Sequence, residues 1–170
     1  RLEFGYKTCT MKALSKSRFK QGLECPNKLY FSNNEKVYHN VKNNDPFLQA
    51  LASGGFQVEE YARLQYPGGV LIEDPEDRKN YDYQDLADQT SELLKQENVV
   101  IYEAAFYIDD LFIRTDVLVK KGTHIKLIEV KAKSIDPSEN YNFVGKSKKI
   151  VSSWKPYLFD LAFQTYVTQR

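Results

Sequence analysis

Three charged residues stand within apolar stretches in the second half of the chain. Asp116 interrupts the run at 112–119, and Glu129 and Lys131 close the run at 125–131. A charge left unpaired in a core costs several kcal/mol, so each of these groups needs a partner. Carboxylates that hold a divalent cation, with a lysine beside the reacting oxygens, meet that need and can hydrolyse a phosphodiester.

The spacing of these residues favours a shared site. Side chains alternate along a strand, so Glu129 and Lys131 point the same way, about 7 Å apart for a rise of about 3.3 Å per residue. Asp116 belongs to the preceding predicted strand, and a matching register brings it beside Glu129. Two neighbouring carboxylates repel each other, and a divalent cation relieves that repulsion. A cross-strand ion pair between one carboxylate and Lys131 fits the same short pattern, so both interpretations stay open.

Hydrophobic periodicity and turn residues predict the elements around these residues. Strands at 99–107, 111–119 and 124–132 have turn residues between them, which predicts an antiparallel meander. A short buried strand is expected at 70–72. The predicted helices cover 14–31 with a break at Cys25-Pro26, 45–55 ending at Gly54-Gly55, 56–65, 83–97 and 156–169.

The composition bounds the class of protein. The chain has 170 residues, which suits one domain, and a formal net charge of +1, which gives no overall basic signal for nucleic acid. Charge is nevertheless uneven, because residues 11–31 and 120–155 are basic and residues 73–88 are acidic. That distribution fits a phosphate-binding face or ordinary surface charge. The sequence contains no run of 18 apolar residues, so no membrane span is expected.

Cysteine content and the first residues bear on location. Cys9 and Cys25 are too few for a disulfide framework, and no charged-then-apolar signal peptide opens the chain. A reducing, cytoplasmic setting is therefore expected. Residues 1–10 are interpreted as tag or upstream sequence, and residues 11–170 as the folded domain.

Three further motifs accompany Asp116 and the Glu129-x-Lys131 pair. They are residues 14–30, with Cys25-Pro26 inside them, residues 55–62, and residues 157–164, which end in Gln164. Together these segments resemble the PD-(D/E)xK nuclease superfamily, in its RecB-like branch, and are similar to CRISPR-associated RecB-like exonucleases. The resemblance spans about 14–166. It extends to bacterial proteins that carry this module ahead of a further C-terminal domain, so the chain is expected to be part of a longer protein.

The resemblance implies an α/β, restriction-endonuclease-like core, in which a central mixed sheet with an antiparallel meander is flanked by helices. It implies a nuclease that hydrolyses DNA phosphodiester bonds with Mg²⁺ or Mn²⁺. Glu60, Asp116 and Glu129 would hold the metal, and Lys131 would position or activate the water. Gln164 would contact DNA or orient Lys131.

Some members of that family also hold an iron–sulfur cluster, through one early cysteine and three late ones. Cys25 could be the early ligand, but the sequence has no late cysteine. Such a cluster needs four thiolates, so none is expected in this chain.

Glu60 is the predicted metal ligand on the early helix. With about 3.6 residues per turn, Phe56, Glu60 and Leu64 share one helix face. Two of these residues are apolar, so that face is expected to pack toward the sheet and to carry Glu60 inward. Glu59 is expected on the neighbouring face, where it can pair with Arg63.

Other charged residues keep two interpretations. Four lysines either bind DNA phosphates as point charges or belong to a solvated loop. They are Lys146, Lys148, Lys149 and Lys155. Glu103, in an apolar strand, is either a further residue of the metal site or the partner of Arg114 or Lys131. For the domain as a whole, the alternatives to a nuclease are a catalytically inactive nucleic-acid-binding or scaffold module, and a structural domain serving a neighbouring enzyme.

Overall fold

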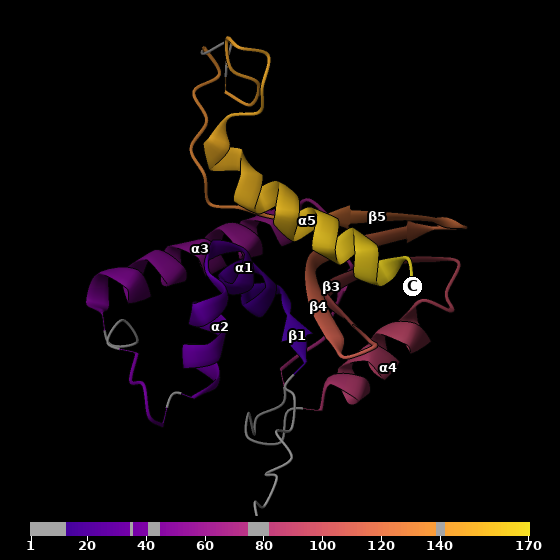
Figure 1. The fold of residues 1–170 in the computed structure, drawn as a ribbon. Coiled ribbons are helices and arrows are strands. Elements are labelled where there is room, and N and C mark those ends of the chain that lie inside the picture. Colours follow the sequence, from indigo (N-terminus) through magenta and orange to yellow (C-terminus); the bar gives the residue numbers. More distant parts are fainter. Residues whose placement is uncertain (1–12, 35, 41–44, 75–81, 139–141) are drawn as a thin grey trace, which may run out of the picture.

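The structure is a computed structural model, and it describes residues 13–34, 36–40, 45–74, 82–138 and 142–170. It is an α/β fold whose mixed sheet has five strands (Figure 1). The strands are β1 (Leu14–Ser15), β2 (Val70–Leu71), β3 (Asn98–Ile108), β4 (Leu111–Lys121) and β5 (His124–Ile128).

The long strand β4 organises the sheet. It pairs with β3 in antiparallel orientation along one edge, and β3 pairs in turn with the parallel strand β2. The other edge of β4 is shared by two short strands: β1 pairs in parallel with Leu111 and Phe112, and β5 pairs in antiparallel orientation with residues 117–121. Residues 113–116 therefore face a gap between the ends of β1 and β5.

The described residues form five α-helices, and capping side chains precede three of them. The five helices are α1 (Lys16–Glu24), α2 (Pro26–Asn33), α3 (Pro46–Leu64), α4 (Tyr83–Leu93) and α5 (Lys155–Thr168), with a short 3-10 turn at Ser152–Trp154. Asp45 accepts hydrogen bonds from the backbone of Phe47 and Leu48 at 2.9 and 3.4 Å, and Asp82 caps α4 in the same way. Such side chains satisfy the free amides of the first helical turn.

Two apolar clusters hold the helices to the sheet. Leu86 of α4 belongs to one cluster with strand residues that include Ile101 and Leu118. Ile113 of β4 belongs to the other, together with Phe163 and Val167 of α5. Helix α5 runs across the sheet beside α1, whereas α4 lies apart from both (Figure 1). Burial of each large apolar side chain contributes about 1.5–3 kcal/mol, so these clusters fix where α4 and α5 sit on the sheet.

Most predicted elements are confirmed. The meander of β3, β4 and β5 is present, and so are the helices α4 and α5. The short strand β2 is also present, but its residues Val70 and Leu71 are exposed, and only Ile72 after it is buried as predicted. The third strand ends at Ile128, so Glu129 and Lys131 lie just beyond it. The strand β1 was not predicted, because an alternation of apolar and polar residues cannot be recognised over two residues.

The predicted helix break at Gly54-Gly55 is wrong. Helix α3 runs without interruption from Pro46 to Leu64. Two glycines cost about 1 kcal/mol each relative to alanine, but unlike proline they keep their amide donors and do not end a helix. The predicted boundary at residue 10 lies outside the described residues.

Candidate active site

The gap along β4 is where charged residues from distant segments meet. Lys16 follows β1 and Glu129 follows β5, and both chain segments run toward the part of β4 that carries Asp116. Because β1 is parallel and β5 antiparallel to β4, their ends converge on this gap. The backbone amide of Val130 donates to Asp116 Oδ2 at 2.5 Å, which holds the chain after β5 against β4.

Asp116 and Glu129 share two lysine ammonium groups in the structure. The ammonium nitrogen of Lys16 lies 3.7 Å from Asp116 Oδ1 and 3.1 Å from Glu129 Oε1. Lys131 pairs with Glu129 and lies 3.9 Å from Asp116 Oδ2. The side chains of Asp116 and Glu129 are only 9% and 7% exposed, so these ion pairs are largely shielded from water. The predicted convergence of Asp116, Glu129 and Lys131 is present.

Helix α5 contributes two buried polar side chains to this cluster. Asp160 is fully buried, and its carboxylate lies 3.5 Å from Lys20 and 3.9 Å from Lys131. Gln164 Nε2 donates to Glu129 Oε2 at 2.6 Å and to Asp160 Oδ1 at 3.4 Å. We define the site cluster as these side chains together: Lys16, Lys20, Asp116, Glu129, Lys131, Asp160 and Gln164.

Burial and pairing set the charges of the cluster. Burial raises the pKa of Asp116 and of Asp160, and their lysine partners only partly offset it. Burial also opposes ionisation of Glu129, but Lys16, Lys131 and Gln164 outweigh it and hold its pKa below the usual value. Burial would lower the pKa of Lys16, yet Glu129, Asp116 and Asp160 outweigh burial and raise it. Lys16 therefore stays an ammonium.

A second acidic group lies opposite Asp116 across the β3–β4 pair. Glu103 has a backbone φ of +56°, a left-handed conformation that is rare for a residue within a strand. Its carboxylate pairs with Arg63 at 3.1 Å and with Arg114 at 3.5 Å. Pairing with Arg114 was one of the two predicted roles of Glu103 and is confirmed. Burial raises the pKa of Glu103, and the two arginines only partly offset this effect.

The prediction that Glu60 points inward is wrong, because Glu59 takes that place. Glu60 is exposed, whereas Glu59 is half-buried and senses the charges of Asp116 and Glu103. Burial and these two carboxylates raise the pKa of Glu59. Its expected partner Arg63 pairs with Glu103 instead.

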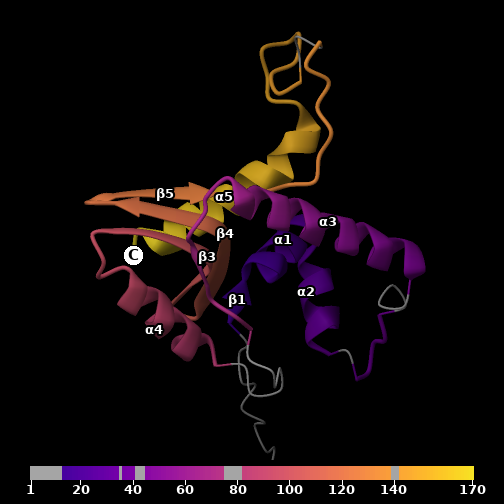
Figure 2. The ribbon, with the colours of Figure 1, turned by 180° about the vertical axis from the view of Figure 1, so that it is seen from behind.

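The physical reason lies in the outer face of α3. Phe56 and Leu64 are 65% and 74% exposed, so the face they share with Glu60 does not pack on the sheet. The C-terminal part of α3 lies nearer the sheet than its N-terminal part (Figure 2). It is anchored there through polar contacts, including the hydrogen bond from Tyr102 Oη to the Arg63 carbonyl oxygen at 3.3 Å.

The predicted roles of Gln164, contact with DNA or orientation of Lys131, stay predictions, and its side chain lies within the cluster. It is 1% exposed, so it is not presented at the surface, and its amide donates to Glu129 and Asp160. Gln164 is therefore a positioning residue for Glu129 in the structure.

Sequence reasoning missed Lys16, Lys20 and Asp160. A signal was available in their spacing: Lys16 and Lys20 stand four residues apart, and so do Asp160 and Gln164. Residues four apart share a helix face, so each pair marks a polar face on a helix that also carries apolar residues. Nothing in the sequence shows that these two faces meet.

The donor atoms of the cluster suit a hard divalent cation. Within the described ranges, no group of three His, Cys, Asp or Glu side chains could hold a metal ion. Mg²⁺, however, is commonly bound through one or two carboxylates, with water and substrate phosphate completing the shell. Asp116 and Glu129 supply such a pair, and the ammonium of Lys16 already bridges them as a cation. The residues thus fit Mg²⁺ or Mn²⁺.

Three of the four predicted phosphate-binding lysines, Lys146, Lys148 and Lys149, lie on a projecting segment before α5, and Lys155 is the first residue of α5. The segment forms a small hairpin, in which Val144 bridges Ile150 and the Gly145 amide donates to the Lys149 carbonyl oxygen at 2.9 Å. Figure 1 shows it extending away from the sheet at the start of α5. Lys148 and Lys149 are exposed on this hairpin. We call residues 142–151 the basic hairpin.

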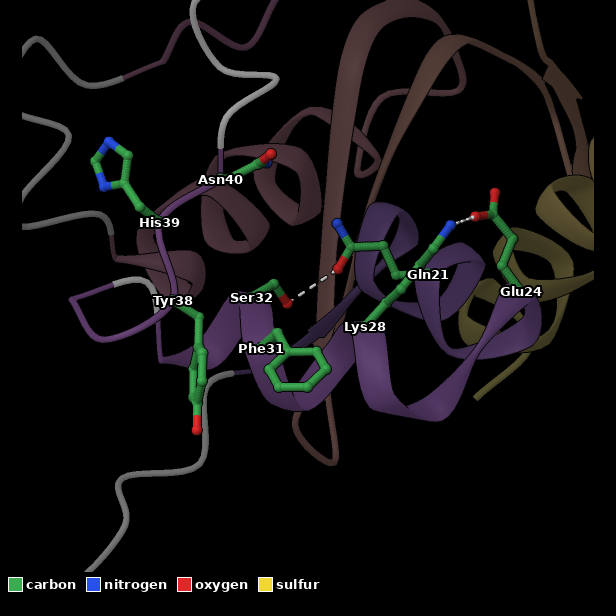
Figure 3. Close-up of a pocket in the computed structure, with 8 residues that line it drawn as sticks. All are labelled: Gln21, Glu24, Lys28, Phe31, Ser32, Tyr38, His39 and Asn40. Atoms are coloured by element: carbon green, nitrogen blue, oxygen red, sulfur yellow. Dashed lines mark hydrogen bonds and ion pairs between the residues drawn. The ribbon is translucent and has the colours of Figure 1, made fainter.

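A cavity lies away from the site cluster. It has a volume of about 650 Å³ and is lined by residues of α1, of α2 and of the segment at 38–40, among them Phe31, Tyr38 and His39 (Figure 3). Ser32 donates to Gln21 at 3.1 Å on its wall. None of its lining residues belongs to the site cluster.

Comparison with protein-family models, with curated proteins and with solved structures found no match. Among the helices of the described residues, none is long and apolar enough to cross a membrane.

Proposed function

We propose that this chain is a metal-dependent nuclease of the PD-(D/E)xK superfamily, with a restriction-endonuclease-like core, that hydrolyses DNA phosphodiester bonds. The observation that carries the proposal is the convergence of Asp116, Glu129 and Lys131 at the gap along β4. These residues come from different segments, and two of them are carboxylates shielded from water. A cytoplasmic location and membership in a longer protein belong to the same proposal.

Each residue of the cluster has a role in this chemistry. A divalent cation bound here would polarise the phosphate that is attacked. Lys131 places a compact positive charge beside Glu129, where it stabilises the negative charge that develops in the transition state. Asp160 lies 3.9 Å from the Lys131 ammonium and limits its movement, and Gln164 holds Glu129 by a 2.6 Å hydrogen bond.

Lysines on and beside the basic hairpin support DNA as the substrate. Lys146, Lys148 and Lys149 are exposed near its turn, and Lys155 begins α5 directly after it. Each lysine that neutralises a phosphate releases a counter-ion and adds to the salt dependence of binding.

Charge reversal on the basic hairpin tests its part in binding. Lys148→Glu together with Lys149→Glu is expected to weaken DNA binding about tenfold or more at low salt, and to flatten the dependence of affinity on salt concentration. Fluorescence anisotropy with a labelled oligonucleotide measures both. The matched control is Lys36→Glu with Lys126→Glu, which changes net charge equally at exposed sites away from the hairpin. An equal loss of affinity in the control pair would show that only net charge matters.

The two glutamates of α3 give a second test. Glu59→Gln is expected to weaken Mn²⁺ binding about three- to tenfold, since Glu59 adds negative charge near Asp116. Glu60→Gln is expected to leave Mn²⁺ affinity within about twofold, because an exposed charge is screened. Calorimetric titration of both variants compares them directly. Equal effects, or a larger effect of Glu60→Gln, would show that α3 turns its other face to the site.

The charge balance of the cluster favours one alternative function. Asp116, Glu129 and Asp160 are matched by Lys16, Lys20 and Lys131, so the carboxylates are neutralised by the protein's own cations. A catalytically inactive module that binds nucleic acid or serves as a scaffold could keep such a cluster for stability alone.

One assay separates the two functions. The purified chain is incubated with single-stranded and double-stranded DNA and with Mg²⁺ or Mn²⁺, beside Asp116→Ala as a control. The nuclease proposal expects cleavage that depends on the cation and disappears in Asp116→Ala. Binding of DNA without cleavage under all these conditions would favour the inactive module.

A further inference from the structure

Lys16 occupies the position that a shared cation would take. Its Nζ lies 3.1 Å from Glu129 Oε1, 3.2 Å from Glu129 Oε2 and 3.7 Å from Asp116 Oδ1. A divalent ion held by the same two carboxylates would sit about 2.0–2.6 Å from each coordinating oxygen. The ammonium and such an ion therefore cannot both lie between Asp116 and Glu129.

The Lys16 ammonium has a route out of this position. Its side chain is 24% exposed, and its remaining hydrogen bond goes to the carbonyl oxygen of Arg114 at 3.4 Å, a weak contact. Lys16 is also the first residue of α1, so its stem is fixed by β1 while its end can swing. Lysine has four methylene groups and many accessible rotamers, so the ammonium can move without a change in the backbone.

We infer that Lys16 is an internal counter-ion, which competes with the divalent cation for Asp116 and Glu129 and is released toward solvent when that cation binds. The inference rests on the proposed function, because it takes a divalent cation as the natural occupant. It assigns to Lys16 control of metal affinity: together with Lys131, the Lys16 ammonium neutralises the two carboxylates without metal, and it lowers the net affinity of the site for metal.

Removal of the Lys16 charge tests this directly. Calorimetric titration with Mn²⁺ compares the unmodified chain with Lys16→Met, which keeps the length of the side chain. Lys16→Met is expected to bind Mn²⁺ about tenfold more tightly or better, because a like charge next to the ion has been removed. The matched control is Lys20→Met, one turn further along α1, where the ammonium pairs with Asp160 at 3.5 Å. Its Mn²⁺ affinity should change less than that of Lys16→Met.

A second measurement needs no substitution. Amine-reactive labelling of the unmodified chain, followed by peptide mass spectrometry, reports how accessible each lysine is. Labelling of Lys16 should rise at least about threefold when Mn²⁺ saturates the site, since its carboxylate partners are then occupied. Labelling of Lys36, exposed and remote from the cluster, should stay unchanged.

The outcomes separate this inference from the proposed function. If the unmodified chain binds Mn²⁺, while Lys16→Met binds it no more tightly or Lys16 labelling does not rise, the counter-ion role is overturned and the nuclease proposal stands. If neither the unmodified chain nor Lys16→Met binds Mn²⁺, both fall. Binding by Lys16→Met alone would support the counter-ion role and speak against metal-dependent cleavage by the unmodified chain.

Discussion

Lys131→Ala is expected to lower the rate of DNA cleavage by about 100-fold or more, the size of effect seen when a single stabilising group is removed from a transition state. Affinity for DNA should change by less than about threefold, because the lysine acts on charge that appears only during reaction. Lys131 lies beside Glu129 and 3.9 Å from Asp116, so it faces the scissile phosphate if the carboxylates hold the cation. Single-turnover cleavage and anisotropy, measured on the same preparation, give the two quantities.

Lys126→Ala is the matched control for this prediction. Lys126 is exposed on β5, the strand that precedes Lys131, and its removal takes away the same charge. Cleavage by Lys126→Ala should stay within about threefold of the unmodified chain, as expected for a screened surface charge. If Lys131→Ala lost DNA binding and cleavage in parallel, Lys131 would act in DNA binding rather than in the chemical step.

Asp116→Asn is expected to weaken Mn²⁺ binding by about 100-fold or more and to abolish detectable cleavage with it. Mutation of a residue that supports a metal ligand typically lowers metal affinity or activity about 10- to 100-fold. Loss of a charged ligand itself should lower both at least as much. The asparagine keeps the size of the side chain and one oxygen that can accept from the Val130 amide, so the fold should be retained. Calorimetry and a cleavage assay measure the two losses.

Asp110→Asn serves as the control on the same hairpin. Asp110 is exposed at the β3–β4 turn, with a φ of +59° that asparagine also tolerates. Both its Mn²⁺ affinity and its cleavage rate should match those of the unmodified chain. Retention of tight Mn²⁺ binding in Asp116→Asn would place the cation elsewhere.

The sheet could be predicted because its strands carry a local signal. Alternating apolar residues and turn pairs such as Asp109-Asp110 define β3, β4 and β5, and the register of a meander follows from its short turns. The convergence of Asp116 and Glu129 is a consequence of that register, in which Val117 pairs with Ile128. This part of the site is therefore encoded by residues close together in the sequence.

The orientation of α3 could not be predicted, because its packing breaks the usual rule for amphipathic helices. Its apolar residues Phe56 and Leu64 face outward, and Glu59 faces the site. The inward face is fixed by polar contacts with β3, namely Arg63 to Glu103 and Tyr102 to the carbonyl oxygen of Arg63. Such contacts join residues about 40 positions apart and leave no periodic signal.

The lysine and carboxylate partners of the site depend on tertiary structure in the same way. Lys16 comes from the start of the domain and Asp160 from its last helix, and α1 and α5 meet through the stacked rings of Phe19 and Phe163, 4.4 Å apart. Packing of these two aromatic residues brings Lys20 to Asp160. Each helix shows a polar pair in sequence, but only the packed fold shows that Lys20 of one pair meets Asp160 of the other.

We propose that Asp116 and Glu129 share one divalent cation, and anomalous diffraction from crystals grown with Mn²⁺ locates such an ion. The proposed shared site requires one anomalous peak at the gap along β4, about 2.0–2.6 Å from a carboxylate oxygen of each residue, with the Lys16 ammonium moved away from both. A peak away from these two carboxylates, or an empty gap in which Lys16 still bridges Asp116 and Glu129 at saturating Mn²⁺, would contradict it.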